Sequence, residues 1–120
     1  MYFKDIVGHT ELKKALTNTV RNDHVSHALM FAGKEGSGNF ALAIAFASYL
    51  LCKNRGEEER CGVCPNCKQL DQLAHPDLHF SFPFVKKSDK ITVTQTFQRD
   101  FKEAVKNNPY LSLKDWEIEI

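Results

Sequence analysis

Apolar and polar residues follow one another in the first half of the chain in a pattern that predicts two helices with a strand between them. Residues 10–22 place apolar side chains on one helical face and basic side chains elsewhere. Residues 28–32 form a short apolar run that ends at Gly33, as in a strand buried on both faces of a parallel sheet. Residues 40–51 are almost unbroken in alanine, leucine, isoleucine and phenylalanine, which favours a buried helix.

The second half of the chain carries shorter patterns. Residues 66–74 predict a short helix that the following His-Pro pair stops. Residues 78–84 alternate apolar and polar side chains and predict a second strand, and residues 91–94 fit a short strand or an extended lead-in. Residues 97–105 then carry a helical apolar face. Two or three strands enclose a small core, so we expect a fragment of a longer protein or a sheet completed elsewhere.

Composition narrows the class of protein. With 120 residues, the chain is long enough for one domain with its own core. Its 42% apolar and 26% charged residues are ordinary for a globular protein, and a net charge of +1 gives no sign of nucleic acid or membrane as a direct partner. No apolar stretch reaches the roughly 18 residues of a membrane span. The N-terminus lacks the apolar core of a signal peptide, so a cytoplasmic location is expected.

The glycine-rich turn over residues 33–40 matches a phosphate-binding loop in its spacing but not in its chemistry. That pattern requires glycine, four residues, glycine, lysine, then serine or threonine. Asn39 stands at the lysine position and Phe40 at the hydroxyl position. The lysine would neutralise phosphate charge and the hydroxyl would bind Mg²⁺. We therefore predict a degenerate loop that does not bind ATP, formed by Gly33, Gly36, Gly38, Asn39 and Phe40.

Three alternatives for this loop stay open. It could be an ordinary glycine turn, it could still bind nucleotide, or a bare anion such as sulfate could sit at the helix N-terminus. Losing one charged contact to phosphate costs roughly 1.5–3 kcal/mol, which disfavours nucleotide binding. No catalytic residues can be assigned, so the chain is not expected to be an enzyme by itself.

Four cysteines gather in one short segment, where two Cys-x-x-Cys units overlap and a fourth cysteine precedes them. Four thiolates around zinc make a closed tetrahedral site with no open position for substrate. A structural zinc ion is therefore predicted, held by Cys52, Cys61, Cys64 and Cys67. An iron–sulfur cluster, redox chemistry at one Cys-x-x-Cys pair, or free thiols remain alternatives. The acidic residues 57–59 are interpreted as a solvated loop, and the five histidines share no metal-ligand spacing.

Several segments together resemble the start of bacterial clamp-loader subunits of DNA polymerase III. The resemblance covers roughly residues 1–84 and rests on the segments 3–9, 25–33 and 75–78 and on the spacing of the four cysteines. It implies the N-terminal part of an ATPase-type (AAA+) domain, an α/β fold with a parallel sheet flanked by helices. It also implies a zinc-binding insertion at about residues 52–74, with residues 85–120 unassigned or a second insertion.

Within that family, the gamma/tau subunits carry a complete phosphate loop and the delta-prime subunits do not, so the chain is more similar to the delta-prime branch. The implied role is a non-hydrolysing structural subunit that helps to load the sliding clamp on primed DNA. Its partners would be gamma/tau and delta, with DNA and the clamp met through the assembled complex. An active gamma/tau-like ATPase and a stand-alone zinc module for nucleic acid are the alternatives. The family's acidic magnesium motif and Ser-Arg-Cys motif are not visible.

Overall fold

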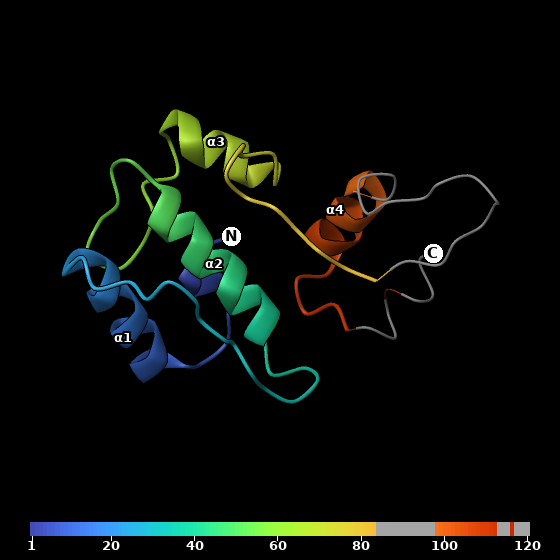
Figure 1. Cartoon of the computed structure of the whole chain (residues 1–120), viewed down its shortest axis with the longest axis horizontal. Helices are drawn as coiled ribbons and strands as arrows, with labels where there is room; N and C mark the ends of the chain where they lie inside the picture. Colours follow the sequence, from blue (N-terminus) through green and yellow to red (C-terminus); the bar gives the residue numbers. More distant parts are fainter. Residues whose placement is uncertain (84–97, 113–115, 117–120) are drawn as a thin grey trace.

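The computed structural model describes residues 1–83, 98–112 and 116, and its regular elements are all helical (Figure 1). In chain order they are η1 (Phe3–Asp5), α1 (Thr10–Arg21), α2 (Asn39–Leu51), α3 (Pro65–Asp71) and α4 (Gln98–Asn107). The four helices predicted from the sequence are confirmed, each within a few residues of its expected bounds. None of the helices in these ranges has the length and apolar content needed to cross a membrane.

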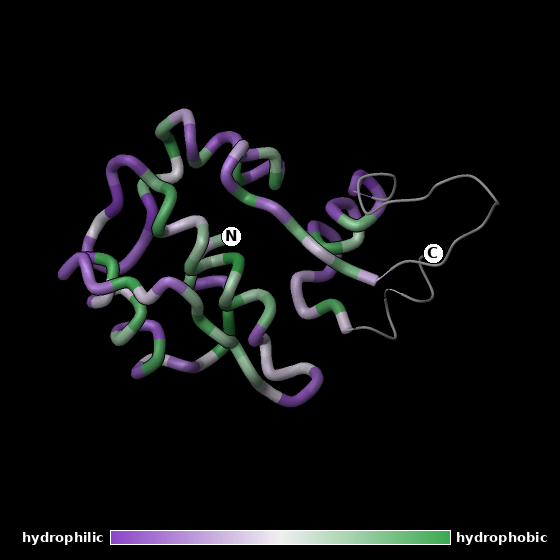
Figure 2. Tube along the Cα trace, in the orientation of Figure 1, coloured by the Kyte–Doolittle hydropathy of each residue, from purple (hydrophilic) through white to green (hydrophobic). Residues whose placement is uncertain are grey.

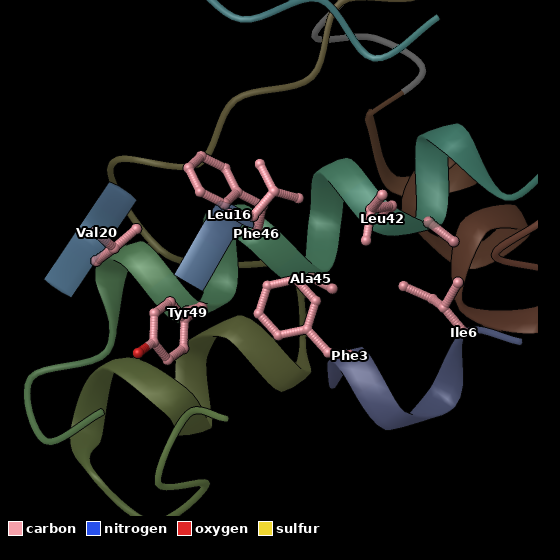
Figure 3. Close-up of a cluster of buried hydrophobic side chains, with 9 residues drawn as sticks. Phe3, Ile6, Leu16, Val20, Leu42, Ala45, Phe46 and Tyr49 are labelled. Carbon is pink, nitrogen blue, oxygen red and sulfur yellow. The ribbon is translucent and has the colours of Figure 1, made fainter. Parts of the chain in front are cut away.

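Helix α2 is the central element, because η1, α1 and α3 all contact it. Figure 3 shows Leu16 and Val20 of α1 beside α2, with Phe3 of η1 close to Tyr49. The rings of Phe3 and Tyr49 lie 5.7 Å apart. A helix covered on several sides must be apolar around most of its circumference, which explains the nearly continuous apolar sequence of α2.

A second apolar cluster joins α4 to the other side of α2. It consists of Ile44, Leu73, Phe82, Phe101, Ala104, Val105 and Trp116. The rings of Phe82 and Phe101 stack at 4.1 Å, and the ring of Trp116 meets Phe101 edge-on at 5.2 Å. Only one face of α4 is buried, and Figure 2 accordingly shows both hydrophilic and hydrophobic residues along it. This helix therefore depends on its aromatic side for its position.

The expected parallel sheet is wrong, since the described residues contain no strand. Residues 28–32 and 78–83 have no regular secondary structure, and the predicted strand at 91–94 lies outside the described residues. Instead of being buried on both faces, Leu29 is 47% exposed and Met30 is 90% exposed. A strand exists only through hydrogen bonds to a neighbouring strand. Residues 25–33 form no backbone–backbone hydrogen bond within the described part of the chain.

Candidate metal centre and glycine loop

Two helix ends and one loop bring the four cysteine side chains together. Cys52 directly follows α2, Cys61 lies in the connecting loop, Cys64 caps the start of α3, and Cys67 lies in its first turn. Backbone amides point at the sulfurs: the N–H groups of Cys61, Cys64 and Cys67 donate to Sγ atoms at 3.3 to 3.4 Å. Such amides stabilise thiolate charge, as a metal centre requires.

The sulfur positions suit a tetrahedral metal ion. The four ligand atoms all lie within 4.8 Å of one another, and none is in a disulfide. The Sγ of Cys52 lies 3.5 Å from that of Cys61 and 3.9 Å from that of Cys64, and the Cys61 and Cys67 sulfurs are 3.8 Å apart. Zinc–sulfur bonds of about 2.3 Å in a regular tetrahedron place the sulfurs about 3.8 Å apart. The four cysteines could therefore hold a metal ion.

The thiols differ in acidity. Hydrogen bonds from the backbone of Cys67 and Lys53 lower the pKa of Cys64 to about 6. Backbone hydrogen bonds from Val63 and Cys64 likewise lower the pKa of Cys61. Burial raises the pKa of Cys67 to about 12, and the neighbouring thiols add to the rise. Without a cation, four sulfurs this close cannot all lose their protons, because like charges disfavour one another.

Arg60 anchors the cysteine segment from within the structure. Its side chain is 2% exposed and forms an ion pair with Asp71, and Nη1 donates to the Cys67 carbonyl oxygen at 3.1 Å. Its guanidinium also lies over the ring of Tyr2, 4.3 Å from the ring centroid. Burial by itself would lower the pKa of Arg60, but Asp71, with smaller contributions from Tyr2 and Cys67, more than offsets this, so the pKa is raised. Arg60 thus links α3, the cysteines and the N-terminal segment.

Glu59 makes the second link between this segment and the N-terminus. Its two carboxylate oxygens accept hydrogen bonds from the backbone N–H groups of Phe3, at 2.8 Å, and Lys4, at 2.9 Å. These are donors at the start of η1, where backbone N–H groups have no partner within the helix. The interpretation of residues 57–59 as a solvated loop therefore fails at Glu59. No local sequence signal could have identified it, because its partners lie 55 and 56 positions away.

We expect Glu59→Ala to lower the free energy of unfolding by about 2 kcal/mol, because two charge-assisted hydrogen bonds are lost. Hydrogen exchange at the amides of Phe3 and Lys4 should accelerate in the same variant. Glu58→Ala is the matched control, since Glu58 is the exposed neighbour. Equal amide protection in the two variants would contradict the anchoring role of Glu59.

The side chains that replace the lysine and the hydroxyl of a phosphate loop are both occupied in the structure. Asn39 Nδ2 donates to the Phe31 carbonyl oxygen at 3.0 Å. Phe40 packs against the rings of Phe80 and Phe101, each with its centroid 6.2 Å away. The loop does keep its glycine conformations, with φ of 83° at Gly38. Asn39 and Phe40 thus both make contacts within the chain, and both also line a cavity beside the loop.

Comparisons with known proteins give a consistent group of relatives. A family model described as "DNA polymerase III, delta subunit" matches residues 8–118. The chain is 33% identical over 105 residues to the DNA polymerase III subunit delta' of Bacillus subtilis, covering 85% of this chain and 32% of the relative. It is 36% identical over 76 residues to subunit tau/gamma of Haemophilus influenzae, covering 63% of this chain and 11% of the relative.

Subunit tau of Escherichia coli is similar at 34% identity over 76 residues, which cover 63% of this chain and 12% of that relative. The chain thus spans about a third of the delta' relative, with 32% covered, and about a tenth of the tau relatives, with 11% and 12% covered. No solved structure matches the chain.

Proposed function

The chain belongs to the DNA polymerase III delta subunit family, a clamp-loader family, and on that premise we propose that it is part of a non-hydrolysing structural subunit of the clamp loader. In this role it helps to load the sliding clamp on primed DNA during replication. The family model and the delta' relative, which is 33% identical over 85% of this chain, support the delta-prime role, whereas a gamma relative covers 93% of the chain at a lower identity of 28%.

One observation carries the proposal: the loop has neither of the side chains that bind and hydrolyse a nucleotide. Asn39 bears no charge and donates its amide to the Phe31 carbonyl oxygen. Phe40 has no ligand atom for Mg²⁺ and packs among other aromatic rings. Phosphoryl transfer depends on the missing lysine and on the Mg²⁺ ion bound by the missing hydroxyl to position the phosphates and to offset their developing charge. A subunit with this loop serves as a support for neighbouring ATPase subunits.

The proposed resident metal is structural zinc, held by Cys52, Cys61, Cys64 and Cys67. The sulfur separations suit a tetrahedral ion, and four thiolates leave no open position for substrate. When bound, the ion supplies a crosslink between the end of α2 and the start of α3. We assign residues 52–74 to this metal-binding module, which lies within a partial ATPase-like domain over residues 1–120. The proposed partners are other clamp-loader subunits, gamma/tau and delta. DNA and the sliding clamp are met through the assembled complex.

Isothermal calorimetry with Mg²⁺–ATP tests the absence of nucleotide binding. We expect no heat of binding for the chain, because the charged contact and the metal ligand are both missing. Asn39→Lys is the informative companion variant, since a charged contact to phosphate contributes about 1.5–3 kcal/mol and should strengthen any binding about tenfold or more.

Micromolar affinity of the unmodified chain for Mg²⁺–ATP would overturn the proposal. It would support the competing function, an active ATPase of the tau/gamma type with an unusual loop, which the tau/gamma relatives make the principal alternative.

A further inference from the structure

The segment that follows α4 folds back onto the glycine loop. Asn108 starts a turn: its side-chain oxygen accepts from the N–H of Tyr110 at 3.1 Å, and its carbonyl oxygen accepts from the N–H of Leu111 at 3.0 Å. This turn directs Tyr110 toward residues about 100 positions earlier in the chain. The hydroxyl oxygen of Tyr110 accepts a hydrogen bond from the N–H of Val7 at 3.2 Å.

The ring of Tyr110 lies against the backbone of Gly38, the residue that precedes α2. A methyl group placed at Gly38 would lie only 2.8 Å from Cε1 of Tyr110. Gly38 also has φ of 83°, which side chains other than glycine rarely adopt. The close backbone approach that glycine permits in a phosphate loop is here made by the chain's own tyrosine.

Pro109–Ser112 also forms the wall opposite the loop. A cavity of about 430 Å³ lies between the two, lined by loop residues on one side and by this segment on the other. This volume is at the lower end of the range for small-molecule sites, about 300–1,000 Å³. The cavity leaves room for a small ligand against the loop, and the ring of Tyr110 restricts that room beside Gly38.

We propose that Pro109–Ser112 restricts access to the glycine loop, with the ring of Tyr110 occupying the space directly beside Gly38. A phosphate-bearing ligand therefore competes with the chain's own segment for the space beside Gly38. This inference rests on the proposed function, because it supplies a second reason, besides Asn39 and Phe40, for the loop to be without nucleotide. It also gives a role to residues after α4 that the family resemblance left unassigned.

Inorganic pyrophosphate is the probe for this competition, followed through the amide NMR shifts of residues 33–40. Three forms of the full chain are compared: unmodified, Tyr110→Ala and Tyr110→Phe. We expect Tyr110→Ala to bind pyrophosphate at least about tenfold more tightly than the unmodified chain. Tyr110→Phe keeps the ring and loses only the bond to Val7, so it should stay close to the unmodified chain.

Equal pyrophosphate affinity in all three forms overturns the inference. Absence of binding to all three forms also overturns it, because the segment then keeps no phosphate-bearing ligand out of the loop. In the unmodified chain, a nuclear Overhauser contact between the Tyr110 ring and the Gly38 α protons must also be present, and its absence overturns the inference without any variant. Each of these failures leaves the proposed function standing. Tight Mg²⁺–ATP binding by the unmodified chain would instead overturn the proposed function.

Discussion

Replacing Cys67 by serine should abolish tight metal binding and remove the stability that the metal supplies. Cys67 is fully buried in the first turn of α3, and its sulfur lies 3.8 Å from that of Cys61. A ligand that binds only the folded state stabilises it by about 4 kcal/mol at a thousandfold excess over its Kd. Thermal unfolding with added Zn²⁺, and again with a chelator, measures this difference. The unmodified chain should show a large shift and the variant almost none.

Val63→Ser is the matched control for Cys67→Ser. Val63 lies between two of the ligands, is 73% exposed, and should leave the zinc-dependent shift unchanged. Titration with Co²⁺ gives a second readout, because tetrahedral thiolate coordination produces characteristic visible absorption. Two outcomes would show that the four cysteines do not form a structural metal site. In one, chelation lowers the unfolding temperature of Cys67→Ser as much as that of Val63→Ser. In the other, chelation changes the unfolding temperature of none of the three proteins.

Phe101→Ala should lower the free energy of unfolding by about 3–5 kcal/mol, the usual range for a buried phenylalanine. Phe101 is 6% exposed, stacks on Phe82 and contacts the rings of Phe40, Phe80 and Trp116. A loss of this size is a large part of the 5–15 kcal/mol that stabilises most domains. Chemical denaturation followed by the fluorescence of Trp116, the single tryptophan of the chain, reports on the same cluster.

Glu103→Ala controls for effects on α4 itself, because Glu103 lies on the exposed face of the same helix. The loss in free energy of unfolding for Phe101→Leu should lie between the losses for Phe101→Ala and Glu103→Ala, since leucine retains most of the buried apolar area. A loss below about 1 kcal/mol for Phe101→Ala would mean that the aromatic cluster does not hold α4 in place.

Much of the candidate site could be predicted because its signals are local. The helices follow from apolar periodicity, since their hydrogen bonds join residues four positions apart. The cysteine segment was identified from spacing alone, and the structure brings its four sulfurs to within 4.8 Å of one another. The replacement of lysine and hydroxyl by Asn39 and Phe40 is likewise a property of the sequence.

The strands could not be predicted in the same way. An apolar run such as residues 28–32 states only that the segment suits burial, and whether a neighbouring strand pairs with it depends on distant residues. The structure leaves Met30 of this run 90% exposed. The apolar pattern was real, but its interpretation as a sheet was wrong for the described residues.

By itself, the sequence determined the helices, the cysteine cluster and the incomplete phosphate loop, because each depends on residues close together in the chain. Only the tertiary structure decided that Glu59 secures η1, that Arg60 joins the cysteines to Tyr2, and that Tyr110 lies against Gly38. These contacts join residues about 55 to 72 positions apart. Long-range contacts form only when the whole chain packs, so no local pattern of polar and apolar residues encodes them.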